Sequence, residues 1–211
     1  MEKEQLKKDL GVIILATIIL GLALSFIDKN WKATLIATTT IFIILMINTI
    51  AKKIFAYNIE TDVTLNFWST YWYGFTRMSH FRKPLSMAWL PLLTSLITLG
   101  NFIWMPIIEF DVSARPERIA RQHGLYRFTA VTEWHIALIA VVGILANLIF
   151  GIGGYILGFE TFATWSMFYA AWSIIPLGRL DGSKIFFGSR KLWTFMLFIL
   201  AMTLLWGLTV I

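Results

Sequence analysis

The chain has 211 residues, of which 58% are hydrophobic and only 14% charged, with a mean hydropathy of +0.73 and a net charge of +6. A soluble domain is typically about 45–50% apolar and about 25% charged, so the composition excludes that class. The absence of cysteine excludes disulfides, thiol catalysis, iron–sulfur clusters and Cys-ligated zinc sites. Because long apolar runs separate the basic residues, the positive charge indicates cytoplasmic loops of a membrane protein rather than nucleic-acid binding.

Five apolar stretches are long enough for transmembrane helices, since a crossing needs roughly 20 apolar residues. The first is too long for a signal-peptide core and is followed by Asp28-Lys29-Asn30 rather than by a cleavage site, which indicates a retained anchor. No repeat, low-complexity tract or linker marks a second domain, so residues 1–211 are predicted to form a single integral membrane domain. The predicted spans cover residues 10–27, 33–51, 136–158, 161–177 and 192–211.

A sixth apolar stretch, Pro84–Ile108, is interrupted by Pro91, Gly100-Asn101 and Pro106. If this stretch crosses the membrane, the two sides hold 8 and 10 of the Lys and Arg residues. If it dips in and returns, the division becomes 16 to 2. The positive-inside rule favours the second layout. We therefore predict a re-entrant segment, an inside N-terminus and an outside C-terminus.

Short β elements are expected at the inner interface. Residues 63–67 alternate with period two, which is typical of a strand. Residues 107–112 and 126–131 are predicted to form a small hairpin around the charged loop 115–124. The aromatic residues that follow the first strand are typical of the headgroup belt: Trp68, Tyr71, Trp72 and Tyr73. The predicted fold class is thus an all-α polytopic membrane protein, with about five spanning helices, one re-entrant or partial-span segment and a small β-strand or hairpin element.

The most informative segment is residues 175–186, where Pro176 and Gly178 interrupt a helix and present Asp181 at the membrane margin. An ordinary turn at a helix end would explain a bare Asp-Gly pair. The longer pattern Pro-x-Gly-x-Leu-Asp-Gly-x-Lys-x-Phe closely resembles the LDG motif of site-2 proteases, the intramembrane zinc metalloproteases, especially their compact archaeal-type members. In that family the Asp is the third protein ligand of a catalytic zinc, and Asp181 matches it. Ser173 stands where the family usually has Asn.

A second segment extends this resemblance. Residues 139–147 look like the family's ALAGPxxN helix, keeping Gly143 and Asn147 but carrying Ile144 where the Pro is expected. Gly143, Asn147 and Gly151 recur at every fourth residue and so share one helix face, where small residues let helices approach closely. Both a packing seam and a catalytic role for Asn147 are compatible with this pattern.

The HExxH helix of the family has no intact counterpart here. In that helix two His residues one turn apart bind zinc, and the Glu is the general base for the metal-bound water. The surroundings align it with residues 48–56, where Asn48 and Lys52 replace the two His residues and Thr49 replaces the Glu. A lysine ammonium has no lone pair for zinc. The resemblance therefore implies a degenerate site at Asn48, Thr49, Lys52, Asn147 and Asp181, at which we expect no catalysis, no metal and no cofactor.

The charges of Lys52 and Asp181 lead to a further structural prediction. An ionised Asp near membrane depth costs about 2.5–3.5 kcal/mol on insertion scales, and Lys52 takes the place of a zinc-binding His. We predict that the two residues form an ion pair that stands in for the zinc and joins their helices. In the alternative arrangement, Lys52 extends outward beside Lys53 and Asp181 faces water.

Three functions fit these observations. The favoured one is a pseudoprotease related to site-2 proteases, which binds or retains transmembrane clients such as single-span membrane proteins. The alternatives are a divergent active intramembrane protease that binds zinc and a structural subunit of a membrane complex. A replacement zinc site built from Asp181 with His80, His123 and His135 is a weaker alternative, since these residues lack metal-ligand spacing. The expected partners are the lipid bilayer and its proteins, not nucleic acid, and the expected location is a prokaryotic plasma membrane.

Overall fold

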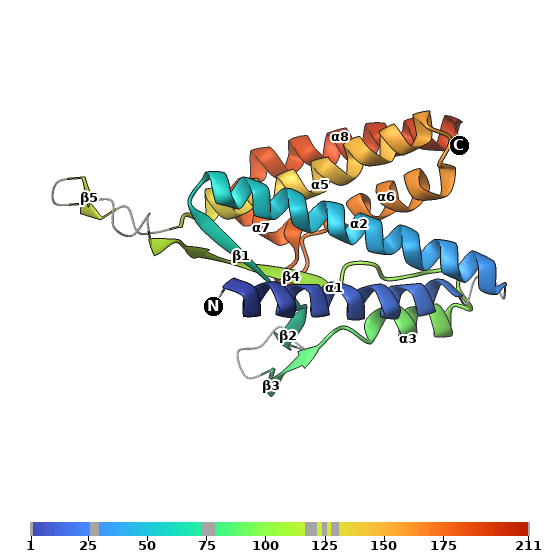
Figure 1. Cartoon of the computed structure of the whole chain (residues 1–211), viewed down its shortest axis with the longest axis horizontal. Coiled ribbons are helices and arrows are strands. Elements are labelled where there is room, and N and C mark those ends of the chain that lie inside the picture. The colour runs from blue at the N-terminus through green and yellow to red at the C-terminus, as the bar shows by residue number, and fades with distance from the viewer. Residues whose placement is uncertain are drawn as a thin grey trace. The chain divides into compact units, whose positions relative to one another are not determined.

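The computed structural model describes residues 2–25, 30–72, 79–116, 122–123, 126–127 and 131–210. Most of these residues are helical, and the strands form small two-stranded sheets (Figure 1). The chain folds into two compact units. Unit 1 comprises Met1–Phe42 and Leu65–Glu109, and unit 2 comprises Ile43–Thr64 and Phe110–Ile211.

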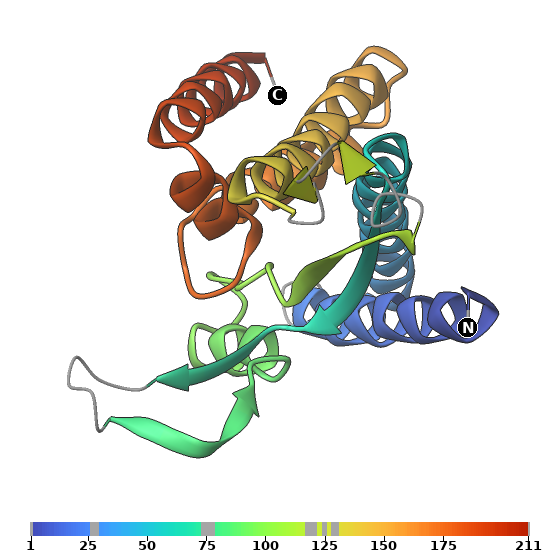
Figure 2. The same cartoon turned by 90° about the vertical axis from the view of Figure 1, so that its left-hand side faces the viewer.

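Unit 1 is built around helix α1. In Figures 1 and 2, α1 and the short helix α3 lie side by side, and Ser95 Oγ of α3 donates a 2.6 Å hydrogen bond to the Ala23 carbonyl of α1. Strands β2 and β3 form an antiparallel hairpin in which Thr70 lies opposite Leu85. The elements of this unit are α1 (Glu2–Ser25), the first part of α2 (Trp31–Asn58), β2 (Ser69–Trp72), β3 (His80–Ser86) and α3 (Leu90–Ile97).

Unit 2 is a cluster of helices centred on α5. Helix α5 packs against α6 and α7, and both of these also contact α8 (Figure 1). Strand β4 pairs with β1 (Thr61–Phe67). Besides the second part of α2, the elements of unit 2 are β4 (Ile108–Ala114), β5 (Gln122–His123), β6 (Tyr126–Arg127), α5 (Glu133–Ile156), α6 (Glu160–Ser173), α7 (Asp181–Gly188) and α8 (Arg190–Val210).

Among the described residues, four helices are long and apolar enough to cross a membrane. They are Glu4–Ser25, Trp31–Asn58, Glu133–Ile156 and Arg190–Gly207, and they correspond to four of the five predicted spans.

The remaining predicted span, 161–177, extends beyond the end of the helix found there. Helix α6 ends at Ser173 and has only 14 residues, about 21 Å at 1.5 Å per residue. Pro176 explains the early end, because a proline lacks a backbone donor and disfavours helical geometry in the residue before it.

The stretch Pro84–Ile108 forms no spanning helix. Its helix α3 has 8 residues, about 12 Å of rise, and cannot cross the roughly 30 Å hydrocarbon layer. Leu99 and Gly100 then adopt positive φ angles of 52° and 85°, and the Gly100 N–H donates a hydrogen bond to the Ser95 carbonyl. The chain therefore turns after α3, as a re-entrant segment requires, and its position in a membrane stays a prediction.

The predicted strand at 63–67 is confirmed as β1, but the predicted hairpin between 107–112 and 126–131 is wrong in its pairing. Strand β4 pairs with β1, and Tyr126–Arg127 pairs with Gln122–His123, while residues 128–130 lie outside the described part. Val63 and Leu65 on β1 and Phe110 on β4 are buried. Pairing β4 with β1 buries the apolar side chains of both strands, which favours this partner.

Candidate functional site

The five residues that match the degenerate motif lie on three helices of unit 2. Three belong to α2, one to α5, and Asp181 begins α7. All of them are buried, with relative exposures between 0 and 6%. Burial of polar groups is unfavourable unless they are paired, so their contacts determine what the site can do. The five site residues are Asn48, Thr49, Lys52, Asn147 and Asp181.

Lys52 and Asp181 are in direct contact. The Lys52 Nζ lies 2.5 Å from the Asp181 Oδ2, and their side chains are 5% and 6% exposed. The structure thus brings together the two residues that the sequence predicts as an ion pair, and Lys52 does not extend outward. A charge-assisted hydrogen bond of this kind is short and strong, and its burial reduces screening by water.

The Asp-Gly dipeptide fixes the start of α7 through close backbone packing. A Cβ atom on Gly182 would lie 2.2 Å from the Ile174 carbonyl oxygen and 2.5 Å from that of Ile175. Only glycine fits there, so the first turn of α7 rests directly on the backbone that follows α6. Gly178, at φ +53°, turns the chain between the two helices. The glycines around Asp181 therefore fix the backbone position at which α7 begins.

Gly143 on α5 makes room for the polar side chains of α2. A Cβ atom at this position would lie 2.5 Å from the Lys52 Cε and 3.0 Å from the Asn48 Nδ2. The aliphatic part of Lys52 thus lies against the α5 backbone. Gly143, Asn147 and Gly151 are all buried on α5, and Gly143 and Gly151 both serve close packing.

Phe110 on β4, which the sequence analysis does not identify, lies against the ion pair. Its side chain is 1% exposed, and its ring centroid is 4.7 Å from the Lys52 Nζ and 3.5 Å from the Lys184 Nζ. The Lys184 ammonium also donates a hydrogen bond to the Phe110 carbonyl. Aromatic faces attract cations, so Phe110 connects β4 to the cations of α2 and α7. No local pattern marks this residue, because its contacts join distant parts of the chain.

Three of the site residues keep buried polar atoms without a hydrogen bond. These atoms are the Asn48 Nδ2, both side-chain polar atoms of Asn147, and the Asp181 Oδ1. Such an atom typically costs about 1–3 kcal/mol. The site therefore retains hydrogen-bonding capacity beyond the ion pair.

The residues at this site do not fit the zinc ion that the family resemblance implies. Protein zinc ligands are Cys, His, Asp and Glu side chains, and Asp181 alone among the five site residues is of that type. Its Oδ2 faces the Lys52 ammonium, which repels a cation and offers no lone pair. Within the described ranges no group of three or more such ligands gathers. No metal chemistry follows from this arrangement.

The three histidines fall at separate elements. His80 is an exposed residue of β3 in unit 1. In unit 2, the His135 Nδ1 lies 2.5 Å from the Thr132 Oγ1 at the start of α5. His123 belongs to β5, and its side chain lies outside the described part.

Comparisons with known proteins found no relative of this chain. Neither family models nor searches of curated proteins and of solved structures gave a match. The functional interpretation accordingly rests on the motif pattern and on the geometry of the five site residues.

Proposed function

We propose that the chain is a catalytically inactive relative of the site-2 proteases, a pseudoprotease that binds or retains transmembrane clients. The observation that carries this proposal is the buried 2.5 Å contact between Lys52 and Asp181. In the family's pattern these two positions are zinc ligands on different helices. Here the ammonium supplies positive charge next to the carboxylate, so the two helices are joined without a metal.

The neighbouring residues support the loss of catalysis. Peptide hydrolysis in this family needs a metal-activated water and a general base. Thr49 offers a hydroxyl, which is a poor base near neutral pH, and Asn48 offers a neutral amide. Neither side chain can take the role of the residue that it replaces.

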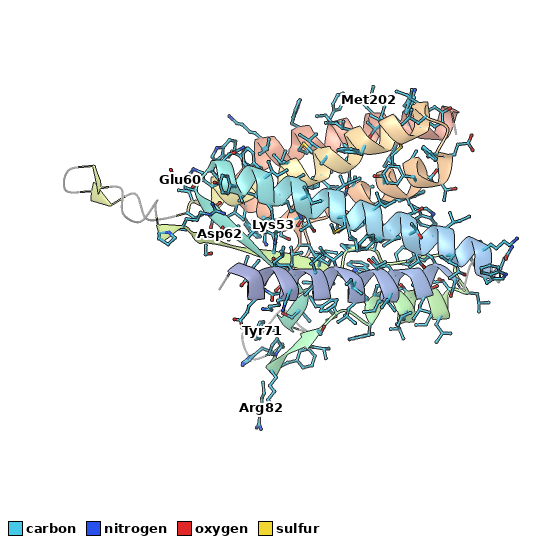
Figure 3. All side chains as sticks on the ribbon, viewed as in Figure 1. Lys53, Glu60, Asp62, Tyr71, Arg82 and Met202 are labelled. Carbon is cyan, nitrogen blue, oxygen red and sulfur yellow. The ribbon has the colours of Figure 1, made fainter. Side chains whose placement is uncertain are left out.

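The outer helix surfaces of unit 2 support client binding. Only 11% of the candidate span in α8 is buried within the protein, so most of its apolar side chains are available to lipid or to another helix. A shallow apolar groove of about 230 Å³ is lined by Ile152 of α5 and by Met202, Thr203 and Trp206 of α8. Met202 lies on the outer side of α8 (Figure 3). Methionine is a flexible side chain that adapts to varied partners.

A reversal experiment tests the relationship to the protease family. The triple variant Asn48→His/Thr49→Glu/Lys52→His rebuilds two His ligands one turn apart and a Glu base beside them. Asp181 would be the third ligand. We expect near-equimolar zinc in the purified triple variant and loss of this zinc when Asp181→Ala is added. Asp111→Ala, at an exposed carboxylate of unit 2, is the matched control and should leave the zinc bound. A folded triple variant without zinc would contradict the proposal.

Client binding is tested by photo-crosslinking in native membranes. A photoreactive amino acid at Met202 should capture single-span membrane proteins, whereas the same amino acid at Asp62, an exposed residue of β1, should not. Recovery of one fixed, stoichiometric multi-span partner at Met202 would instead favour a structural subunit of a membrane complex.

The proposed layout places the protein as a multi-pass protein in a prokaryotic plasma membrane, with its N-terminus inside. Because the chain has no cysteine, single substitutions give unambiguous labelling. A Lys83→Cys and an Asp111→Cys variant lie on either side of the segment 84–108, and we expect both to react from the inside. Reaction from opposite sides would show that the segment crosses.

A further inference from the structure

The exposed surface of unit 1 changes from basic to apolar along residues 80–99. All seven residues of β3 are exposed, including Arg82 and Lys83. Figure 3 shows Arg82 pointing away from the rest of unit 1. Trp89 follows, and after it come the exposed apolar side chains of α3 and the turn that ends it: Leu93, Leu96, Ile97 and Leu99.

Among the described residues, no carboxylate forms an ion pair with the two basic residues of β3, Arg82 and Lys83. Positions 63–108 contain no Asp or Glu at all. An uncompensated basic surface of this kind is the electrostatic complement of an anionic lipid surface.

The β2–β3 hairpin carries exposed apolar and aromatic side chains as well as basic ones. Phe81 and Leu85 of β3 are exposed apolar residues that flank Arg82 and Lys83 in the chain. Lys83 is exposed as well, and its four-carbon stem allows the ammonium to extend to the membrane surface. Tyr71 of β2 is also exposed, and aromatic residues with a polar end favour the membrane–water interface.

The length of α3 limits how deeply it can enter a bilayer. Its 8 residues rise about 12 Å, less than half of the roughly 30 Å hydrocarbon layer. If the apolar end of α3 enters the hydrocarbon, Trp89 lies near the interface and the basic residues of β3 lie at the level of the headgroups.

We propose that Arg82 and Lys83 bind the headgroups of anionic phospholipids in the leaflet that the segment 84–108 enters. Recognition is by charge, so a glycerol and a serine headgroup are bound alike and a choline headgroup is not. Each basic residue near an anionic surface enriches such lipids by roughly fivefold. This site belongs to unit 1 and does not depend on the pseudoprotease proposal.

The experiment measures which lipids surround the hairpin in the full-length protein. A fluorophore on a Leu85→Cys variant reports quenching by nitroxide-labelled phosphatidylglycerol or phosphatidylcholine, each present as a minor component of phosphatidylcholine vesicles. We expect the phosphatidylglycerol to be enriched at least about fivefold. Arg82→Gln and Lys83→Gln should each lower this ratio, and the double variant or about 1 M salt should bring it near one.

The control removes one positive charge elsewhere in unit 1. Lys32→Gln, at the exposed start of α2, should leave the ratio unchanged. Labelled phosphatidylserine should quench as strongly as phosphatidylglycerol, and selective quenching by only one of them would overturn recognition by charge. The proposal is also overturned by a ratio near one in the parent protein, by a ratio that survives in the double variant, or by water-like fluorophore emission, which would assign this surface to solvent.

Discussion

Two ion pairs of unit 2 have nearly the same geometry and very different surroundings. The Lys52–Asp181 distance is 2.5 Å and the Arg179–Asp111 distance is 2.6 Å. The first pair has side chains that are 5% and 6% exposed, and the second has side chains that are 49% and 44% exposed. An exposed pair contributes about 0–1 kcal/mol, whereas removing one partner of a buried pair costs about 3–5 kcal/mol. Burial, not distance, therefore decides how strongly the loss of one partner destabilises the protein.

Breaking the buried pair on one side should have the largest effect. We expect Lys52→Met to lower the free energy of unfolding in detergent by about 3–5 kcal/mol, because it leaves the Asp181 carboxylate buried without a partner. The double variant Lys52→Met/Asp181→Leu should lose much less than either single variant. If the losses of the single variants simply add in the double variant, the two residues are not coupled.

Disturbing the close backbone packing at Gly182 should have the second-largest effect on stability. Gly182→Ala places a methyl group against two backbone carbonyls that cannot move aside, and overpacking of this kind costs about 1–3 kcal/mol. Gly153→Ala in α5 is the matched control, since nothing lies within 4 Å of its Cβ position. The higher helix propensity of alanine should keep that variant at least as stable as the parent protein. Denaturant unfolding of the two variants compares them directly, and equal stabilities would contradict close packing at Gly182.

Removing the aromatic ring beside the pair should have a moderate effect. Phe110→Leu keeps an apolar side chain but removes the ring face that the Lys52 and Lys184 ammonium groups contact. We expect a loss of about 1–2 kcal/mol in the free energy of unfolding. Phe81→Leu, at an exposed residue of β3, should change stability little. A Phe110→Leu variant as stable as the parent protein would exclude the ring from the support of the ion pair.

Breaking the exposed pair should have the smallest effect. We expect Arg179→Gln to change the free energy of unfolding by no more than about 1 kcal/mol, and this change should shrink in high salt. The loss in Lys52→Met should persist at the same salt concentration, because its partner is buried. Thermal unfolding of both variants at low and high salt measures this contrast, and the same salt response in both would contradict it.

The parts of the structure that depend on local sequence could be predicted, and the long-range contacts could not. Apolar run length identifies the four long helices, but it overestimates α6, because Pro176 ends the helix although the apolar residues continue. The Lys52–Asp181 contact could be predicted because a known motif relates two distant positions. The pairing of β4 with β1 and the place of Phe110 depend on contacts between segments far apart in the chain, which no local periodicity records. The close packing of Gly182 against two backbone carbonyls is likewise visible only in three dimensions.

The metal content of the purified parent protein distinguishes a site joined by an ion pair from a zinc site. Cells are grown with added zinc, the protein is purified without a chelator, and zinc is measured by elemental analysis beside the Asp181→Ala variant. We expect far less than one zinc per chain in both proteins, because the Lys52 ammonium lies beside the Asp181 carboxylate, repels a cation and offers no lone pair. A near-equimolar zinc content in the parent protein that falls in the Asp181→Ala variant would contradict it.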